Sequence, residues 1–158
     1  MIHRFKRYPF FLLIIVMSLL NASCKSKKIA TDVSKARPVL KGDLKQRYAA
    51  LLDVKEKDLD NEKLYRFIDS WLGVPHRQGG MDKNGVDCSG FTTLLENEIY
   101  DRSLPRTASL MAGEVKRKFE EELKEGDLVF FDFEGQKFSH VGVYLQNNKF
   151  VHASSSKG

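Results

Sequence analysis

The sequence predicts an α+β fold in which helices come first and an antiparallel sheet follows. Apolar residues recur at helical spacing through the first half of the folded part. After Gly126-Asp127 the pattern changes to short apolar runs separated by polar turns, which is typical of strands. Because helices and strands are segregated along the chain, the sequence favours an α+β domain over an alternating α/β one.

Two helices are expected first. A short amphipathic helix starts at Asp43, and a second begins after Asn61, a natural N-cap, and ends before Gly73 and Pro75. The polar, glycine-rich residues 76–87 are then expected to form a loop. The apolar stripe of the second helix is expected to pack into the core; it consists of Leu64, Phe67, Ile68, Trp71 and Leu72.

The second half of the folded part supplies two more helices and the sheet. One helix is expected directly after Asp87, and another over residues 107–123, following the break at Leu104-Pro105. The strands are expected at residues 128–131, 141–145 and 149–151.

The N-terminus is typical of an export signal. Basic residues precede the apolar run 10–20, which is too short to span a bilayer but suits a signal peptide. Ala22 and Ser23 lead into Cys24, and this segment resembles a bacterial lipoprotein signal, whose cysteine carries the lipid. We therefore expect a signal peptide over residues 1–23, a tether over residues 24–42, a membrane anchor at Cys24 and a folded domain over residues 43–158. A plain secretory signal is the alternative.

The charge pattern argues against nucleic-acid binding. The chain has a formal net charge of +5, but residues 1–47 hold 11 Lys and Arg against 2 Asp and Glu. The remaining 15 basic residues face 19 acidic ones, so the folded part has a balance of −4. The basic excess favours an anionic membrane surface, and the folded part lacks the basic footprint of a nucleic-acid-binding domain.

Cys88 is the candidate nucleophile. Asp87 can cap the helix that follows, which places the Cys88 thiol at the positive end of the helix dipole and favours the thiolate. If Cys24 carries lipid, no second thiol remains to form a disulfide with Cys88. The competing interpretation is a small buried core residue, because free cysteine is among the most buried residue types.

Two histidines in the strand region complete a possible catalytic set. A cysteine nucleophile needs a base within hydrogen-bond reach and a third group that orients the base. His140 and His152 differ by twelve positions, so a regular two-residue turn at Asn147-Asn148 would place them on opposite faces of the sheet. We therefore predict an odd-length loop or a β-bulge that returns both imidazoles to one face.

Five segments resemble the NlpC-type cell-wall peptidases in order and spacing. They are residues 86–91 (VDCSGF), 104–107 (LPRT), 126–128 (GDL), 139–142 (SHVG) and 150–154 (FVHAS). The resemblance covers about residues 60–158. It implies a papain-like core and an enzyme that cuts the peptide part of peptidoglycan.

The resemblance also implies roles for individual residues. Cys88 matches the nucleophile, His140 the general base and His152 the residue that orients it, and the reaction would pass through a thioester. The bond cut would be that between D-glutamate and a diamino acid in the stem peptide. Substrate contacts are expected from His76, Asp87, Ser89 and Arg106. No cofactor or metal is implied, and the chain is expected to be a monomer.

This sequence departs from the family pattern in two places. His76 stands where the family usually has a tyrosine that assists the oxyanion. Family members continue past the His152 segment with further strand, whereas this sequence stops at Gly158. The resemblance therefore implies either that the sequence is truncated or that the sheet lacks an edge strand and leaves an open edge.

Three alternatives remain open. The first is a weak or inactive wall-binding lipoprotein of peptidase ancestry. The second is a zinc site built from Cys88 and three histidines, although these residues lack the short paired spacings of structural zinc sites. The third is an acyltransferase on the same broad fold, which the order of Cys88 before the histidines disfavours.

Overall fold

The computed structural model describes residues 43–133 and 135–155. The sequence predictions for residues 1–42, including the signal peptide, the tether and the lipid site at Cys24, lie outside the described residues. Within the described ranges, no helix combines the length and the apolar character needed to cross a membrane.

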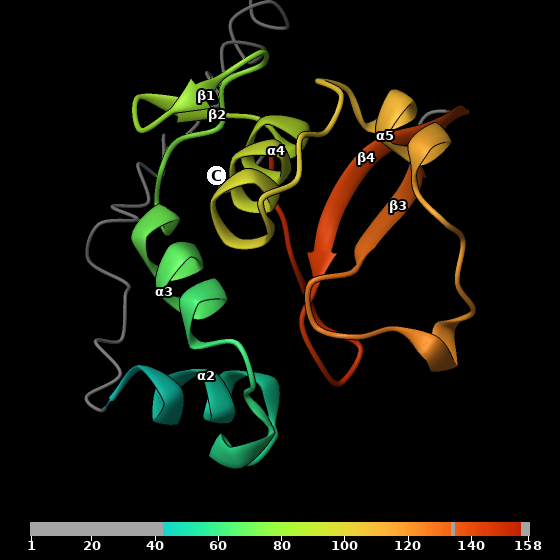
Figure 1. Ribbon diagram of the computed structural model, residues 1–158. Coiled ribbons are helices and arrows are strands. Elements are labelled where there is room, and N and C mark those ends of the chain that lie inside the picture. The colour runs from blue at the N-terminus through green and yellow to red at the C-terminus, as the bar shows by residue number, and fades with distance from the viewer. Residues whose placement is uncertain (1–42, 134, 156–158) are drawn as a thin grey trace, which may run out of the picture. The chain divides into compact units, whose positions relative to one another are not determined.

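Helices make up the first part of the fold (Figure 1). They are α2 (Leu44–Leu52), α3 (Glu62–Trp71) and α4 (Cys88–Tyr100), with the 3₁₀ turn η1 (Glu56–Asp58) between the first two. The predicted cap of α3 is confirmed, because the side chain of Asn61 accepts a hydrogen bond from the Leu64 N–H at 3.1 Å. Four unpaired N–H groups begin every helix, so this cap satisfies one of them and fixes where α3 starts.

A three-stranded antiparallel sheet follows, in the order β3, β4, β5. Its strands are β3 (Leu128–Phe133), β4 (Gln136–Tyr144) and β5 (Phe150–Val151), which confirms the predicted strands. The short helix α5 (Ala108–Glu114) and α4 both pack on β4, and α4 also packs on α3 (Figure 1). The sheet is therefore joined to the helical part through α4, the helix that carries Cys88.

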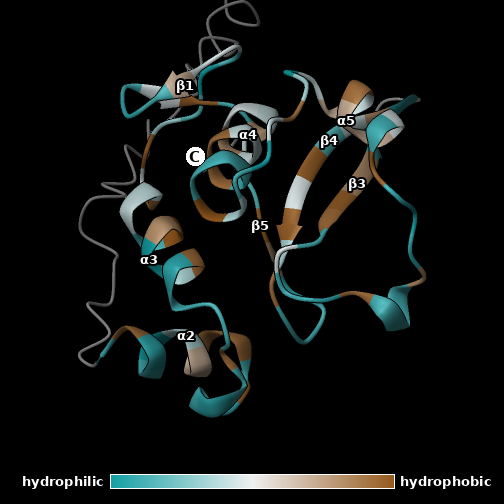
Figure 2. Ribbon diagram, viewed as in Figure 1, coloured by the Kyte–Doolittle hydropathy of each residue, from teal (hydrophilic) through white to brown (hydrophobic). Residues whose placement is uncertain are grey.

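The main hydrophobic core lies between the helices and the sheet. It joins buried residues of α2, α3 and α4 to the sheet residue Val143 and to Leu145. Figure 2 shows hydrophobic stretches on α4 and on the strands β3 and β4. A smaller cluster of Ala108, Met111 and Val141 packs α5 against β4, and Cys88 packs at its edge. The candidate nucleophile thus sits on the rim of a packed cluster, which holds its backbone in place.

The predicted helix over residues 107–123 is wrong in length. The helix α5 ends at Glu114, Val115 is extended, and only the 3₁₀ turn η2 (Glu120–Glu122) follows. The basic run 116–118 offers no apolar stripe to bury, and Phe119 is 76% exposed. Lys118 instead reaches across to Asp127, with its Nζ 2.7 and 2.8 Å from the two carboxylate oxygens.

The predicted loop over residues 76–87 contains a small hairpin. The strands β1 (Met81–Asp82) and β2 (Gly85–Val86) pair antiparallel around a two-residue turn at Lys83-Asn84. The side chain of Asp82 accepts a hydrogen bond from the Asn84 N–H at 2.8 Å, which closes the turn. The hairpin brings residues 76–80 alongside Val86 and Asp87. The Arg77 N–H donates to the Val86 carbonyl and the Asp87 N–H donates to the Gly80 carbonyl, so Arg77 and Gly80 lie beside the start of α4.

Gly90 permits this close approach, and an alanine there is expected to destabilise the protein. A Cβ at position 90 would lie 2.3 Å from the carbonyl oxygen of Gly80, a backbone atom that cannot move alone. We expect Gly90→Ala to lower the free energy of unfolding by about 2 kcal/mol or more, measured by urea denaturation. Gly113→Ala is the control: nothing lies within 4 Å of its Cβ. That variant should be neutral or stabilising, and equal losses in the two variants would contradict the argument.

Candidate active site

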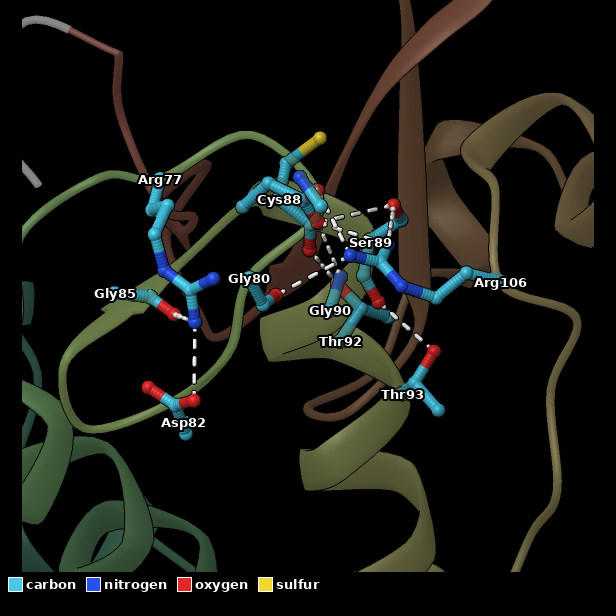
Figure 3. A network of polar contacts seen from close by, with 12 residues as sticks. Arg77, Gly80, Asp82, Gly85, Cys88, Ser89, Gly90, Thr92, Thr93 and Arg106 are labelled. Carbon is cyan, nitrogen blue, oxygen red and sulfur yellow. Dashed lines mark hydrogen bonds and ion pairs between the residues drawn. The ribbon is translucent and has the colours of Figure 1, made fainter.

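Cys88 is the first residue of α4, and Asp87 caps the helix as predicted. Oδ1 of Asp87 accepts a hydrogen bond from the Gly90 N–H at 2.7 Å, and the Asp87 carbonyl accepts one from Phe91 at 2.9 Å. These bonds leave the N–H of Cys88 without an acceptor within the part of the chain that the structure describes. Figure 3 shows the Cys88 sulfur pointing away from the polar network that surrounds the Asp87 cap.

Arg106 donates two hydrogen bonds to the carboxylate of Asp87. Its Nη1 lies 2.9 Å from Oδ1 of Asp87 and its Nη2 lies 2.8 Å from Oδ2. The Gly79 N–H donates to Oδ2 at 2.6 Å, and Arg106 also donates to Oγ of Ser89 at 2.8 Å and to the Gly80 carbonyl at 3.2 Å (Figure 3). The carboxylate of Asp87 therefore connects the start of α4 to the 77–80 segment and to Arg106, which lies two residues before α5.

The charge of Asp87 is stabilised although the side chain is buried. Burial alone would raise the pKa of this carboxyl, but the hydrogen bonds from Arg106 and from the N–H groups of Gly90 and Gly79 outweigh it, and the pKa lies below its usual value. The charged form of Asp87 is thus favoured, and its hydrogen bonds fix the backbone at the start of α4, where Cys88 lies.

The turn between β4 and β5 confirms the prediction made for the two histidines. Val143 pairs with Val151 and Tyr144 with Phe150, and the Leu145 N–H donates to the Lys149 carbonyl at 2.9 Å. The three residues 146–148 therefore lie between the last paired positions, with Asn147 and Asn148 in the left-handed region. The odd-length loop brings His140 and His152 to one face.

The two imidazoles are hydrogen-bonded to each other. Nε2 of His140 lies 2.7 Å from Nδ1 of His152, and the rings are perpendicular, at 88°. This bond occupies one nitrogen of each ring, so the nitrogen of His140 that remains for a thiol proton is Nδ1. For Nδ1 to accept that proton, Nε2 of His140 must carry the hydrogen and donate it to His152.

Both histidines are held towards the neutral form. Burial lowers the pKa of His140, and the positive charges that His152 and His76 can carry lower it further. Burial also lowers the pKa of His152. Neutral imidazole is the form that can accept a proton, so these shifts extend the range in which His140 can act as a base.

The predicted site residues of the described chain line one open cleft of about 1120 Å³. His76, at the edge of the cleft, pairs with Val86 in an isolated bridge. Cys24 is the exception, because it lies outside the described residues. Among the residues described, no three His, Cys, Asp or Glu side chains are grouped so as to hold a metal ion. The site residues that the cleft brings together are Cys88, His140, His152, His76, Asp87, Ser89 and Arg106.

Two aromatic residues of the cleft were not anticipated from the sequence. Phe133 is 57% exposed, and its ring stands perpendicular to His140 with the centroids 5.5 Å apart. Phe138 has a positive φ of 51°, because the β3–β4 pairing shifts register between Phe131 and Phe133. The only sequence signal was the aromatic run of residues 130–133, which a strand pattern explains equally well.

The lowered pKa values of the histidine pair predict a loss of stability in mild acid. The unfolded state binds protons at an ordinary histidine pKa of about 6.5, whereas the folded state binds them only at lower pH. The stabilisation is therefore fully present above pH ~6.5 and is lost as the pH falls through the folded pKa values. We expect the urea midpoint to fall between pH 7 and pH 5, and to fall less in His152→Gln. A midpoint that rises over this interval would contradict the pKa directions.

The fold and the arrangement of the cleft define a papain-like α+β domain with a cysteine at the start of a helix, one histidine in the sheet and a second directly after its last strand. A solved NLP/P60 family protein of Staphylococcus aureus, described as similar to lipoprotein, superposes with a TM-score of 0.55 at 31% identity, over 63% of this chain and 36% of that one. The NlpC/p60 domain of the peptidoglycan hydrolase SagA superposes with a TM-score of 0.54, over 62% of this chain and 84% of that one. At 24% identity this second likeness shows the fold alone.

The NlpC/P60 family model matches residues 73–158, and the chain belongs to this family. The chain is 47% identical over 92 residues to the probable endopeptidase NlpC of Escherichia coli, covering 58% of this chain and 60% of that protein. It is 40% identical over 107 residues to the E. coli protein named murein DD-endopeptidase MepS/murein LD-carboxypeptidase, covering 68% and 53%. The matches thus span between a half and two thirds of these relatives' length.

Proposed function

We propose that this chain is a cysteine peptidase that hydrolyses the stem peptides of peptidoglycan. The observation that carries the proposal is the joint placement of Cys88, at the capped start of α4, and the hydrogen-bonded His140–His152 pair in one open cleft. A thiol, a base and a group that orients the base are the parts that acyl transfer through a cysteine needs.

The residues would act in sequence. Nδ1 of His140 takes the proton of the Cys88 thiol, and the thiolate attacks the carbonyl carbon of the peptide bond. The free N–H of Cys88 stabilises the oxyanion, and His140 returns the proton to the leaving amine. Water, activated by His140, then hydrolyses the thioester. His152 acts through His140, because its hydrogen bond holds the tautomer that leaves Nδ1 unprotonated.

The substrate follows from the relatives. Two related E. coli proteins are named murein endopeptidases, and a third is a probable endopeptidase. For this chain we propose the bond between D-glutamate and the diamino acid, although the names of the murein enzymes refer to DD- and LD-bonds. The main hydrogen-bond partners of Arg106, Ser89 and Asp87 are one another, so we propose that they contribute to substrate binding by holding the wall of the cleft. Arg106, whose side chain is 35% exposed, is the residue of the three that substrate would contact.

We also propose that the enzyme works in the cell envelope as a monomer. The signal expected over residues 1–23 would export the chain, and lipid on Cys24 would anchor it through the tether of residues 24–42. The basic excess of the N-terminal part would add attraction to anionic lipids.

The test is digestion of purified muropeptides by the full chain, with the products identified by mass. The expected result is cleavage between D-glutamate and the diamino acid that iodoacetamide abolishes and EDTA leaves unchanged. Cleavage at a D-alanyl bond would replace the proposed specificity but keep the cysteine mechanism. No cleavage of any muropeptide, together with retained binding to peptidoglycan, would overturn the enzyme proposal in favour of a wall-binding protein, with His76 in place of the usual tyrosine as the first position to revert.

A further inference from the structure

A second cavity, of about 620 Å³, lies apart from the catalytic cleft. Its walls come from α4, from α5 and the segment that follows it, and from the strands β3 and β4. Phe138 lines both cavities, so the two are neighbours. The volume lies in the range of small-molecule sites, and the floor is apolar, with Leu104, Leu128 and Phe130.

One buried group of this cavity lacks a partner. Glu96 is 1% exposed, and within the described residues its Oε1 has no hydrogen bond, while Oε2 has a long contact of 3.4 Å with Nη1 of Arg102. Burial raises the pKa of the Glu96 carboxyl, the ion pair with Arg102 opposes this, and the net pKa lies above its usual value. A buried polar atom without a partner costs about 1–3 kcal/mol, so a ligand that hydrogen-bonds to Oε1 would remove this cost.

The charged groups around the cavity have an excess of cations. Lys118 is neutralised by Asp127, and Arg102 faces Glu96. Lys116 and Arg117 also line the cavity, and neither forms an ion pair with any described carboxylate. The guanidinium of Arg117 lies over the Phe138 ring, 5.8 Å from its centroid. An anion would therefore meet uncompensated positive charge at the mouth and apolar surface below it.

We propose that this cavity binds a small amphiphilic anion, with an apolar body and a single carboxylate or phosphate. The apolar body packs against Phe130 and Phe138, and the anionic group lies between Lys116, Arg117 and Arg102. In its protonated form Oε1 of Glu96 donates a hydrogen bond to an oxygen of the ligand, which gives this atom the partner it lacks. Binding at this site does not depend on the proposed peptidase activity.

The test uses four probes that share a ten-carbon chain: decanoate, decyl phosphate, decyltrimethylammonium and decanol. Each is titrated into the full chain below its micelle concentration, and heat is recorded by calorimetry. We expect saturable binding of one or both anions, and the tighter of the two identifies the headgroup. Equal binding of all four probes, or no binding of either anion, would overturn the proposal.

Charge reversal locates the site. The double variant Lys116→Glu/Arg117→Glu changes two exposed side chains and is expected to weaken anion binding by about tenfold or more. Lys137→Glu is the matched control, because Lys137 lines the catalytic cleft and not this cavity, and it should change the affinity less than about twofold. The reverse pattern would place the anion in the catalytic cleft and refute the second site.

Three further variants test the interior of the cavity. Ala112→Leu fills the cavity from α5 and should abolish anion binding if it folds. Glu96→Gln keeps a hydrogen-bond donor and should retain binding, whereas Glu96→Leu removes the donor and should weaken binding by about fivefold. Equal affinities in Glu96→Gln and Glu96→Leu would show that Oε1 does not contact the ligand and would overturn that part of the assignment.

Discussion

Replacement of Cys88 by alanine is expected to abolish peptide release from peptidoglycan, with kcat/KM falling by about 10⁴-fold or more. No other thiol lies in the described chain, so the proposed catalytic set would lose its nucleophile and nothing in that chain could replace it in kind. The loss should appear in kcat, while binding to peptidoglycan persists. The measurement is the initial rate of muropeptide cleavage by wild type and variant under the same conditions.

The fold of the variant is expected to survive. Cys88 is only partly buried and packs at the edge of the Ala108, Met111 and Val141 cluster, so removal of one sulfur costs about 1 kcal/mol. Cys88→Ser, which keeps the volume but loses the reactivity of the thiol, is the matched control and should be almost as inactive. Either variant retaining a tenth of the wild-type rate would show that the nucleophile lies elsewhere.

Local rules were sufficient to predict the start of α4. Asp87 is a capping residue, and the apolar positions after Cys88 recur at helical spacing, so the position of the thiol needed no tertiary information. The shared face of His140 and His152 was also predictable, because strand parity allows it only with an odd-length loop. The five NlpC-type segments predicted the fold, since they extend over both the helical and the sheet part of the domain.

Features that depend on contacts far apart in the sequence were not predictable. The helix predicted over residues 107–123 ends at Glu114, and Lys118 beyond it pairs with Asp127, a contact that the local pattern does not show. Phe133 faces His140 only through the register shift in β4, which no local pattern shows. The role of Arg106 was also hidden, because the sequence predicted a substrate contact while the structure adds a double hydrogen bond to Asp87.

Arg106→Met is expected to destabilise the protein by about 3 kcal/mol at neutral pH. Asp87 is 4% exposed, so loss of the guanidinium leaves a buried carboxylate whose remaining donors are the N–H groups of Gly79 and Gly90 and the Ser89 hydroxyl. This expected loss of stability lies at the lower end of the range for breaking a buried ion pair, because the Arg106 side chain is 35% exposed and partly screened by water. Urea denaturation measures the change.

Arg77→Met provides the control within the same network. Arg77 pairs with Asp82 at 3.0 Å, but both side chains are more than half exposed (Figure 3), so this pair should contribute less than about 1 kcal/mol. The same substitution is thus made in a buried and in an exposed pair. Equal losses would mean that the burial of Asp87 has no energetic consequence.

The pH dependence separates a lost charge partner from lost packing. In the wild type the low pKa of Asp87 contributes stability that is present above the unfolded value of about 3.9 and is lost as the pH falls through the folded pKa. Without Arg106, burial is opposed by fewer partners and the folded pKa rises, so the variant recovers stability on acidification while the wild type loses it. The difference in free energy of unfolding between the wild type and Arg106→Met should therefore narrow towards pH ~4.

A second substitution, Asp87→Asn in the Arg106→Met background, should reduce the same difference in free energy of unfolding at neutral pH. The amide oxygen of asparagine can still cap α4, but the side chain carries no charge to desolvate. A difference that stays constant with pH and is not reduced by Asp87→Asn would mean that Arg106 acts through packing alone.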